Sequence, residues 1–341
     1  MIKEPVKNRF YELDALRGFC AISVLLYHYT TCYTLVYYAP VKPLFLFPWI
    51  EYRIQIFSLI SGFVIFMTLE KTKRPLDFVV SRFSRLYPCY FAAIILTSIL
   101  VNVYALPGAW VSLSHITANL FMIEEWVGAK RVDGVYWMLT VEISFYTLLL
   151  LVYMGKKLKY IEELGLLWLT LMILNARVLG FIPIHMPPLL LVSRLLTYGH
   201  LFIAGIVFYN LKTKGESWQR HMILALCLVT QAMVKDIAAV ISLAGCFIVF
   251  YLFIYERLRF IAVKPLLFLG TISYSLYLIH QYVGYIIINH LYAIGANAWL
   301  RLIIPTAVSL LIAMIMTWAI EKPFRLRIKK VYFKMAEKQC R

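Results

Sequence analysis

The sequence predicts an all-α membrane protein that crosses a bilayer about ten times, an expectation that rests on composition, apolar runs and charge distribution. Of the 341 residues, 62% are hydrophobic and 15% are charged, and the mean hydropathy is +0.78. Soluble globular domains do not reach such values, because they need a polar surface. Apolar stretches of roughly twenty residues recur along the chain, each long enough to span the hydrocarbon core as a helix.

We expect each of these apolar runs to form one membrane-spanning helix. Lys3, Lys7 and Arg9 precede the first run, and no small-residue cleavage site follows it, so we expect this span to be retained. The seventh is the shortest. The expected spans are about 13–36, 52–69, 83–104, 136–154, 163–181, 188–210, 220–234, 237–254, 268–291 and 298–320.

The domain organisation is simple. No internal repeat, low-complexity segment or appended soluble domain is visible, so we expect a single integral-membrane domain over residues 1–341. Its basic tail is expected at about 322–341. The oligomeric state cannot be read from these patterns.

The charges alternate between successive connections. The net charge is +17, but the Lys and Arg residues form short clusters between apolar runs, a pattern typical of cytoplasmic loops and unlike a nucleic-acid-binding surface. Rich clusters lie at 71–85, 156–159, 212–220, 257–264 and 322–341, whereas the intervening connections hold one or two basic residues each. The alternation predicts that both termini lie in the cytoplasm. We expect a multi-pass protein of the inner (cytoplasmic) cell membrane.

The six cysteines do not indicate a redox or metal framework. Most lie within apolar runs and none forms a CxxC pair, so we expect neither a disulfide framework nor a thiolate metal site.

The connection at 105–135 is the long one on the predicted outer side. It carries an amphipathic stretch and the acids Glu124, Glu125 and Asp133. It can be re-entrant or lie along the interface, and the sequence leaves both open.

Ionisable residues inside the first span are the strongest local indication of function, because charges in a bilayer are costly. Arg17 and His28 are eleven residues apart, which places them on one helical face and roughly 16 Å apart along the axis. Asp14 lies one turn before Arg17 and can pair with it. The alternative is an interfacial Arg17 that extends to water and a His28 bonded to a neighbouring helix.

The second and third spans carry two further motifs. Ser61 lies in a segment whose small residues allow close helix contact, and packing is its expected role. Arg82 and Arg85 are three residues apart, hence on one face at the cytoplasmic mouth, and a pair like this can hold phosphates. Ordinary anchoring by positive residues explains the two arginines as well.

Polar groups also occur in the fourth span. Glu142 lies in the span, where a carboxylate must be protonated or paired. Tyr136, Trp137 and Thr140 lie on or near its upstream face.

The ninth and tenth spans add one stripe and one acid. Ser273, Tyr277 and His280 follow at i, i+4 and i+7 and form a polar stripe on an apolar helix. Glu321 lies at the expected cytoplasmic boundary, where a structural ion pair explains it as well as chemistry does. Pro323 is expected to end that helix.

These motifs together resemble membrane acyltransferase family 3, whose members O-acylate cell-surface glycans. Six blocks occur in family order from the first span to the last, and together they are highly specific: L-D-A-L-R-G with Arg17-x10-His28, F-S-L-I-S-G-F, R-F-S-R-L-Y-P, W-M-L-T-V-E-I-S-F-Y, I-S-Y-S-L-Y-L-I-H and I-E-K-P-F. Met138 and Thr140 stand where Ser is common, and Ile143 where an acid often follows Glu142. These departures leave the expected reaction class unchanged and concern the identity of the acceptor. Many relatives carry an extracytoplasmic hydrolase-like domain, which we expect to be absent here.

The resemblance implies an O-acyltransferase, usually an O-acetyltransferase, without a permanently bound cofactor or metal. Acetyl-CoA or another acyl-CoA would be the cytoplasmic donor, and a hydroxyl of a surface polysaccharide or lipid-linked glycan would be the acceptor. The remaining expected partner is the lipid of the membrane. We do not expect nucleic acid to be a partner. His28 would act as the general base. The catalytic set is His28, Arg17 and Glu142, the donor-binding set is Arg17, Arg82 and Arg85, and the supporting set is Asp14, Ser61, Tyr136, Trp137, Ser273, Tyr277, His280 and Glu321.

Other interpretations compete with this one. A transporter or glycan flippase would use its intramembrane charges as a proton relay, although inverted repeats and matched broken helices are not evident. A metal site from His28, His280 and Glu142 lacks close ligand spacing. A covalent acyl-histidine is an alternative to direct transfer.

Overall fold

The structure is a computed structural model that describes residues 9–37, 43–46, 53–177 and 187–339. All regular elements in these ranges are helical. The long helices are α1 (Tyr11–Tyr27), α3 (Arg53–Glu70), α4 (Pro75–Val103), α6 (Trp137–Met154), α7 (Ile161–Arg177), α8 (Pro187–Lys214), α9 (Trp218–Val234), α10 (Ile237–Ile254), α11 (Lys264–Ala293), α12 (Ala298–Ile315) and α13 (Lys322–Gln339). Short elements are η1 (His28–Cys32), α2 (Tyr33–Tyr37), α5 (Leu113–Leu120), η3 (Gly134–Tyr136), η4 (Leu158–Tyr160), η5 (Arg259–Ile261) and η6 (Met316–Glu321).

Seven helical segments in the described part are long and apolar enough to cross a bilayer, so the predicted all-α multi-pass membrane fold is confirmed. They correspond to the first four and the last three predicted spans. The other three predicted spans fall on α7, α8 and α9, of which α7 and α9 have 17 residues each. Residue 52 and residues 178–181 of the predicted spans lie outside the described residues. The count of ten crossings and the cytoplasmic termini stay predictions.

Two helices are longer than the sequence predicted. Helix α4 begins at Pro75 rather than 83, because Pro75 fits the first turn and the Asp77 carboxylate accepts the Arg74 backbone N–H, 3.2 Å away. The expectation that Pro323 ends the last span was wrong, since α13 continues to Gln339. The π-helical segment η6 precedes the proline and accommodates its missing N–H by widening the turn.

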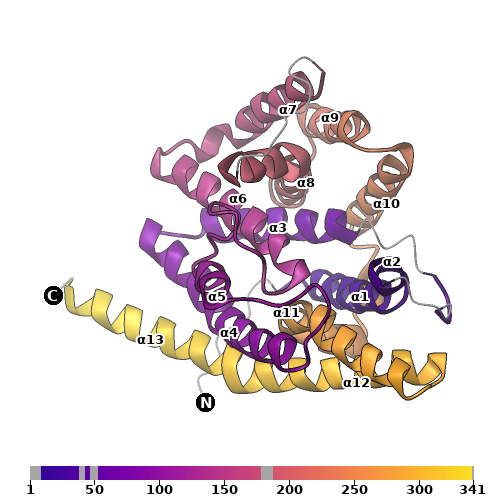
Figure 1. Cartoon of the computed structure of the whole chain (residues 1–341). Helices are drawn as coiled ribbons and strands as arrows, with labels where there is room; N and C mark the ends of the chain where they lie inside the picture. Colours follow the sequence, from indigo (N-terminus) through magenta and orange to yellow (C-terminus); the bar gives the residue numbers. More distant parts are fainter. Residues whose placement is uncertain (1–8, 38–42, 47–52, 178–186, 340–341) are drawn as a thin grey trace.

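Close helix pairs form the framework of the bundle. A Cβ on Gly18 of α1 would overlap the Leu266 carbonyl of α11, and one on Gly270 of α11 would overlap the Asp14 carbonyl. Gly62 of α3 approaches the backbone of α8 in the same way, which confirms that the small residues near Ser61 serve packing. Figure 1 shows α3 between the group α7–α10 and the group α1, α11 and α12.

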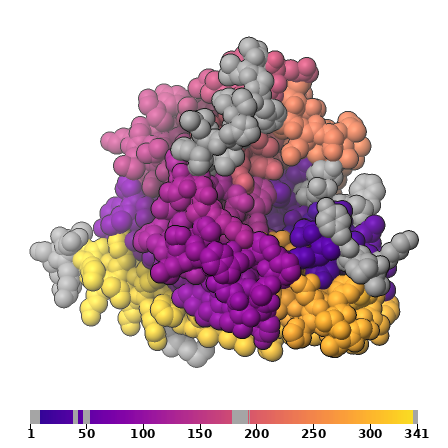
Figure 2. Space-filling view, in the orientation of Figure 1, coloured from indigo at the N-terminus to yellow at the C-terminus, as the bar shows by residue number. Residues whose placement is uncertain are grey.

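The connection at 105–135 folds back onto the bundle. In Figure 2 the purple and magenta segment that includes α4, α5 and the following loop forms one continuous surface over the middle of the molecule. The buried Asn119 side chain bonds to the Lys130 carbonyl (2.9 Å) and accepts the Val132 N–H (3.1 Å). Asp133 accepts the Tyr282 N–H of α11 at 3.2 Å, and burial raises the pKa of this carboxyl to about 7. The loop therefore fixes η3 and the start of α6 against α11.

Candidate active site

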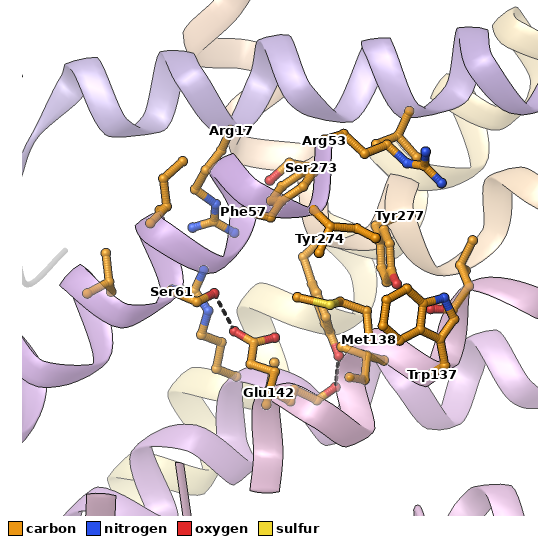
Figure 3. A pocket seen from close by; sticks show the side chains of 18 of the residues that line it. Arg17, Arg53, Phe57, Ser61, Trp137, Met138, Glu142, Ser273, Tyr274 and Tyr277 are labelled. Carbon is orange, nitrogen blue, oxygen red and sulfur yellow. Dashed lines mark hydrogen bonds between the residues drawn. The ribbon is translucent and has the colours of Figure 1, made fainter. Parts of the chain in front are cut away.

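A central cavity of about 170 Å³ lies where α1, α3, α4, α6 and α11 meet. Most of the residues singled out from the sequence line it, although they come from five separate helices. Its walls include Arg17, His28, Ser61, Arg82, Arg85, Trp137, Glu142, Ser273 and Tyr277. Figure 3 shows its two ends: Arg17, Ser61 and Glu142 gather at one end, and Arg53, Trp137 and Tyr277 lie at the other.

The first end is cationic. Arg17 from α1 and Arg82 and Arg85 from α4 all line it, so the prediction that Arg82 and Arg85 share a face is confirmed. The Arg82 Nη2 donates to Thr68 Oγ1 at 3.4 Å, and its buried Nε has no hydrogen-bond partner among the described residues. A guanidinium with an unused N–H beside a cavity is suited to an anionic ligand.

Glu142 faces these arginines across the cavity. Its Oε1 accepts the Ser61 hydroxyl at 2.7 Å, which joins α3 to α6 (Figure 3). The same oxygen accepts the hydroxyl of Tyr146, one turn further along α6. The sequence predicted that this carboxylate is protonated or paired inside the span, and in the structure its partners are these two hydroxyl groups. Glu142 lies at the same end of the cavity as Arg17 (Figure 3).

His28 is 4% exposed and lines the cavity directly after the end of α1, as the first residue of η1. Its Nδ1 lies 2.9 Å from the Val24 carbonyl and 3.1 Å from Nε2 of His280. The Nδ1 of His280 in turn lies within 3.0 Å of the Leu276 and Tyr277 carbonyls.

These contacts select one tautomer for each ring. A ring nitrogen next to a carbonyl carries the proton, so His280 is protonated on Nδ1 and its Nε2 is an acceptor. His28 Nδ1–H then donates to that Nε2 and to Val24, leaving His28 Nε2 unprotonated. His280 is not among the residues that line the cavity. It contacts the Nδ1 of His28, the ring nitrogen that also faces the Val24 carbonyl.

A π-helical turn begins at His28 and ends at Cys32. π-Helical turns are rare, appear mostly as single turns inside α-helices, and are frequent at functional sites. The next residue, Tyr29, donates to the His280 carbonyl (2.7 Å) and contacts Ser309 Oγ (2.7 Å), so it locks α1 to α11 and α12. Sequence periodicity assumes a regular helix, so it gave no indication of this turn.

Arg53 is a site residue that sequence reasoning missed. It is the first residue of α3, lines the cavity and stacks over the Tyr27 ring at 4.5 Å. Its position as a cation in the first turn of an apolar run was the feature of the sequence that could have identified it as a site residue. Gln281 also lines the cavity, and its Oε1 has no hydrogen-bond partner among the described residues.

Four predicted residues occupy other positions than expected. Asp14 pairs with Arg9 at 2.6 Å instead of Arg17, because the side chain of Arg9, two residues before α1, reaches the Asp14 carboxylate. Tyr136 is fully buried and donates to the Leu278 carbonyl at 3.1 Å, outside the cavity lining. Glu321 also lies outside the lining, where it accepts the Ser275 hydroxyl at 3.3 Å. Thr140 bonds to Glu124 at 2.9 Å.

Apart from His280, the remaining predicted positions fall on the cavity wall. Ser273 donates to the Gly270 carbonyl at 2.9 Å, and Tyr277 donates to the Val135 carbonyl, which ties η3 to α11. Within the described ranges no group of three or more His, Cys, Asp or Glu side chains is arranged to hold a metal ion. In the alternative ligand set, His28 and Glu142 line the cavity and His280 does not.

Comparison with known families gives one match. A family profile described as an acyltransferase domain matches residues 10–318, nearly the whole chain. The match spans α1 through η6 and thus every helix that lines the cavity. The chain matches no curated protein and no solved structure closely enough to support a comparison. The profile and the six sequence motifs agree, so the chain belongs to membrane acyltransferase family 3.

Proposed function

We propose that this acyltransferase moves an acetyl group from acetyl-CoA, which enters from the cytoplasm, to a sugar hydroxyl of a surface polysaccharide or lipid-linked glycan on the outer side. The observation that carries the proposal is the two-ended cavity: three arginines at one end and a buried histidine with an unprotonated Nε2 further along. The enzyme would act in the inner cell membrane.

The donor would bind with its phosphates at the cationic end. Arg17, Arg82 and Arg85 supply forked donors that match phosphate oxygens. The pantetheine arm of CoA is long and thin and would follow α1 over the roughly 16 Å that separates residues 17 and 28. The thioester would then lie beside His28.

His28 would act as general base in a direct transfer. Its Nε2 takes the proton of the acceptor hydroxyl while that oxygen attacks the thioester carbonyl carbon. A carbon–oxygen bond forms, the carbon–sulfur bond breaks, and the departing CoA sulfur takes the proton back from the imidazolium. His280 would hold the ring in the productive tautomer, in the way that the third group of a catalytic triad does.

Donor binding gives the first test. Arg85→Ala should weaken acetyl-CoA affinity by roughly 10- to 100-fold, since one charge-assisted hydrogen bond contributes about 1.5–3 kcal/mol. Titration calorimetry in detergent measures the affinity, and dephospho-CoA thioesters show whether the contact is to the ribose phosphate. Lys73→Ala removes an exposed charge from the same basic stretch and is the matched control. Unchanged acetyl-CoA affinity in both Arg82→Ala and Arg85→Ala would show that the two arginines do not bind the donor and only help to orient the protein in the membrane.

The topology gives a second test. Lys330→Cys in the exposed part of α13 and Val127→Cys in the 105–135 connection should react with a membrane-impermeant maleimide from opposite sides. Intact and inside-out vesicles are labelled in parallel and read peptide by peptide, which separates the new cysteines from the native ones. Labelling of both positions from one side would contradict the ten-span topology.

A further inference from the structure

A second set of cavities meets the central one at Trp137. A cavity of about 390 Å³ is lined by Trp137, Arg194, Thr197, Tyr198, Val234 and Lys235. A neighbouring cavity of about 130 Å³ shares Thr197, Tyr198 and Lys235 with it and adds Ile54, Gln55, Leu201 and Gln231. Trp137 and Ile54 also line the central cavity. We call these two cavities the lateral passage; it lies where α3, α6, α8 and α9 meet, at the end of the bundle away from Arg82 and Arg85.

The deep part of the lateral passage is lined by buried amides. Gln55 and Gln231 are 3% and 4% exposed. The Gln231 Oε1 is occupied by His200 Nε2 at 2.5 Å, and Gln55 Nε2 donates to the Ala239 carbonyl at 2.8 Å. This leaves the Gln231 amide nitrogen without a hydrogen-bond partner among the described residues. Gln55 Oε1 also accepts from Cys246 Sγ at 4.0 Å. The Gln231 amide nitrogen can therefore donate to an occupant that offers hydroxyls or similar groups.

The mouth of the lateral passage is aromatic. The rings of Trp137 and Tyr198 lie 5.3 Å apart at an angle of 41°. Arg194 stacks over Trp137 at 4.9 Å, and Lys235 lies 5.8 Å from the Tyr198 ring. Aromatic faces beside hydrogen-bonding amides match a pyranose, which has apolar C–H faces and a rim of hydroxyls.

The charged residues of the lateral passage indicate whether the sugar it binds is neutral or anionic. Its walls hold two cations, Arg194 and Lys235, and no acid among the described lining residues. Glu125 is shared between Arg194 (3.1 Å) and Arg131 (2.5 Å), so it does not neutralise both. Asp236, the residue after Lys235, accepts the Ala239 N–H at 2.8 Å at the start of α10. Lys235 is exposed and makes no ion pair with a described acid. The excess positive charge favours an anionic ligand.

We infer that the lateral passage binds the acceptor and that the acceptor is an anionic sugar. Its ring stacks at Trp137 and Tyr198, its hydroxyls meet Gln55 and Gln231, and its carboxylate or phosphate lies between Arg194 and Lys235. A sugar held there reaches the central cavity past Trp137, on the side opposite to the donor arginines. The inference rests on the proposed function, since it names the substrate class that His28 would deprotonate.

The test is protection of a thiol placed in the lateral passage. Thr197→Cys is labelled with a maleimide in purified detergent-solubilised protein, and the rate at residue 197 is read by peptide mass spectrometry. Methyl β-glucoside, methyl β-glucuronide and glucose 1-phosphate are added in parallel. At least one anionic probe should protect at about tenfold lower concentration than the neutral one, as expected for one charge-assisted contact. Preference for the glucuronide identifies an acidic sugar, and preference for glucose 1-phosphate identifies a sugar phosphate.

Two charge variants in the Thr197→Cys background complete the experiment. Lys235→Gln should abolish the anionic preference, whereas Arg177→Gln removes an exposed positive charge next to the passage, bonded to Met233, and should leave the preference intact. Equal protection by all three probes, or protection by none, would overturn the inference. Selective protection in a preparation that transfers no acetyl group would instead contradict the proposed function and leave the anion site in place.

Discussion

Acetyl transfer by the His28→Ala variant should be roughly 10²–10⁴-fold slower than by the wild type, the usual contribution of a general base. His28 is the buried imidazole on the cavity wall, and its Nε2 is the ring nitrogen left free by contacts to Val24 and His280. Acetyl-CoA affinity should stay within about twofold, because the donor phosphates would lie at the arginine end. Product formation by mass spectrometry and donor affinity by calorimetry measure the two effects on the same preparation.

A second histidine provides the control for this substitution. His290 lies near the C-terminal end of α11, against the edge of Tyr104, and does not line the central cavity. His290→Ala should therefore retain transfer within a few-fold of wild type. If the His28 variant acylates at a near wild-type rate, His28 is not the base and His280 becomes the candidate.

Replacement of His280 should have the next largest effect. His280→Ala should lower the transfer rate on the order of 10- to 100-fold, by analogy with the loss seen when the group orienting a metal-bound imidazole is removed. The expected loss is smaller than for His28, because the Val24 carbonyl still accepts the His28 Nδ1–H. Nitrogen chemical shifts of labelled histidine report which ring nitrogen is protonated. The wild type should show His28 protonated on Nδ1, and the variant a mixture of both tautomers.

A conservative substitution separates positioning from packing. His280→Gln places an amide oxygen near the position of Nε2 and should restore most of the rate and the Nδ1 tautomer, whereas His280→Leu fills the space without an acceptor and should restore neither. A wild-type tautomer pattern in His280→Leu would show that the ring contact has no positioning role.

Local patterns in the sequence determined the helices and the residues that belong to a site. Apolar runs mark the spans because every backbone polar group must be paired within the segment in a bilayer. Arg17 and His28 share a face because eleven residues make close to three turns, and Arg82 and Arg85 share one for the same reason. The members of each pair line the same cavity, in agreement with their shared faces. That the two pairs meet in one cavity came from the structure.

The tertiary structure alone decided which partners these residues have. His28 meets His280 across 252 positions of sequence, and Glu142 meets Ser61 across 81, distances over which helical periodicity carries no information. The same limit explains the wrong expectations: Asp14 faces Arg17 by spacing but bonds to Arg9 from the preceding chain, and Tyr136 belongs to a site motif but points to Leu278.

Sequence by itself therefore fixed the class of protein, the approximate position of its helices and the ionisable residues inside them, since hydrophobicity and helical spacing are properties of one segment at a time. The structure decided that Arg53 belongs to the cavity wall, that a π-turn begins at His28, that Pro323 continues a helix and that cations line a second passage beside Trp137. Each of these four features depends on how helices that are distant in sequence pack against one another. Small residues such as Gly18, Gly62 and Gly270 set the distances between these helices, because they allow the backbones to come into contact. No pattern along the chain encodes these contacts.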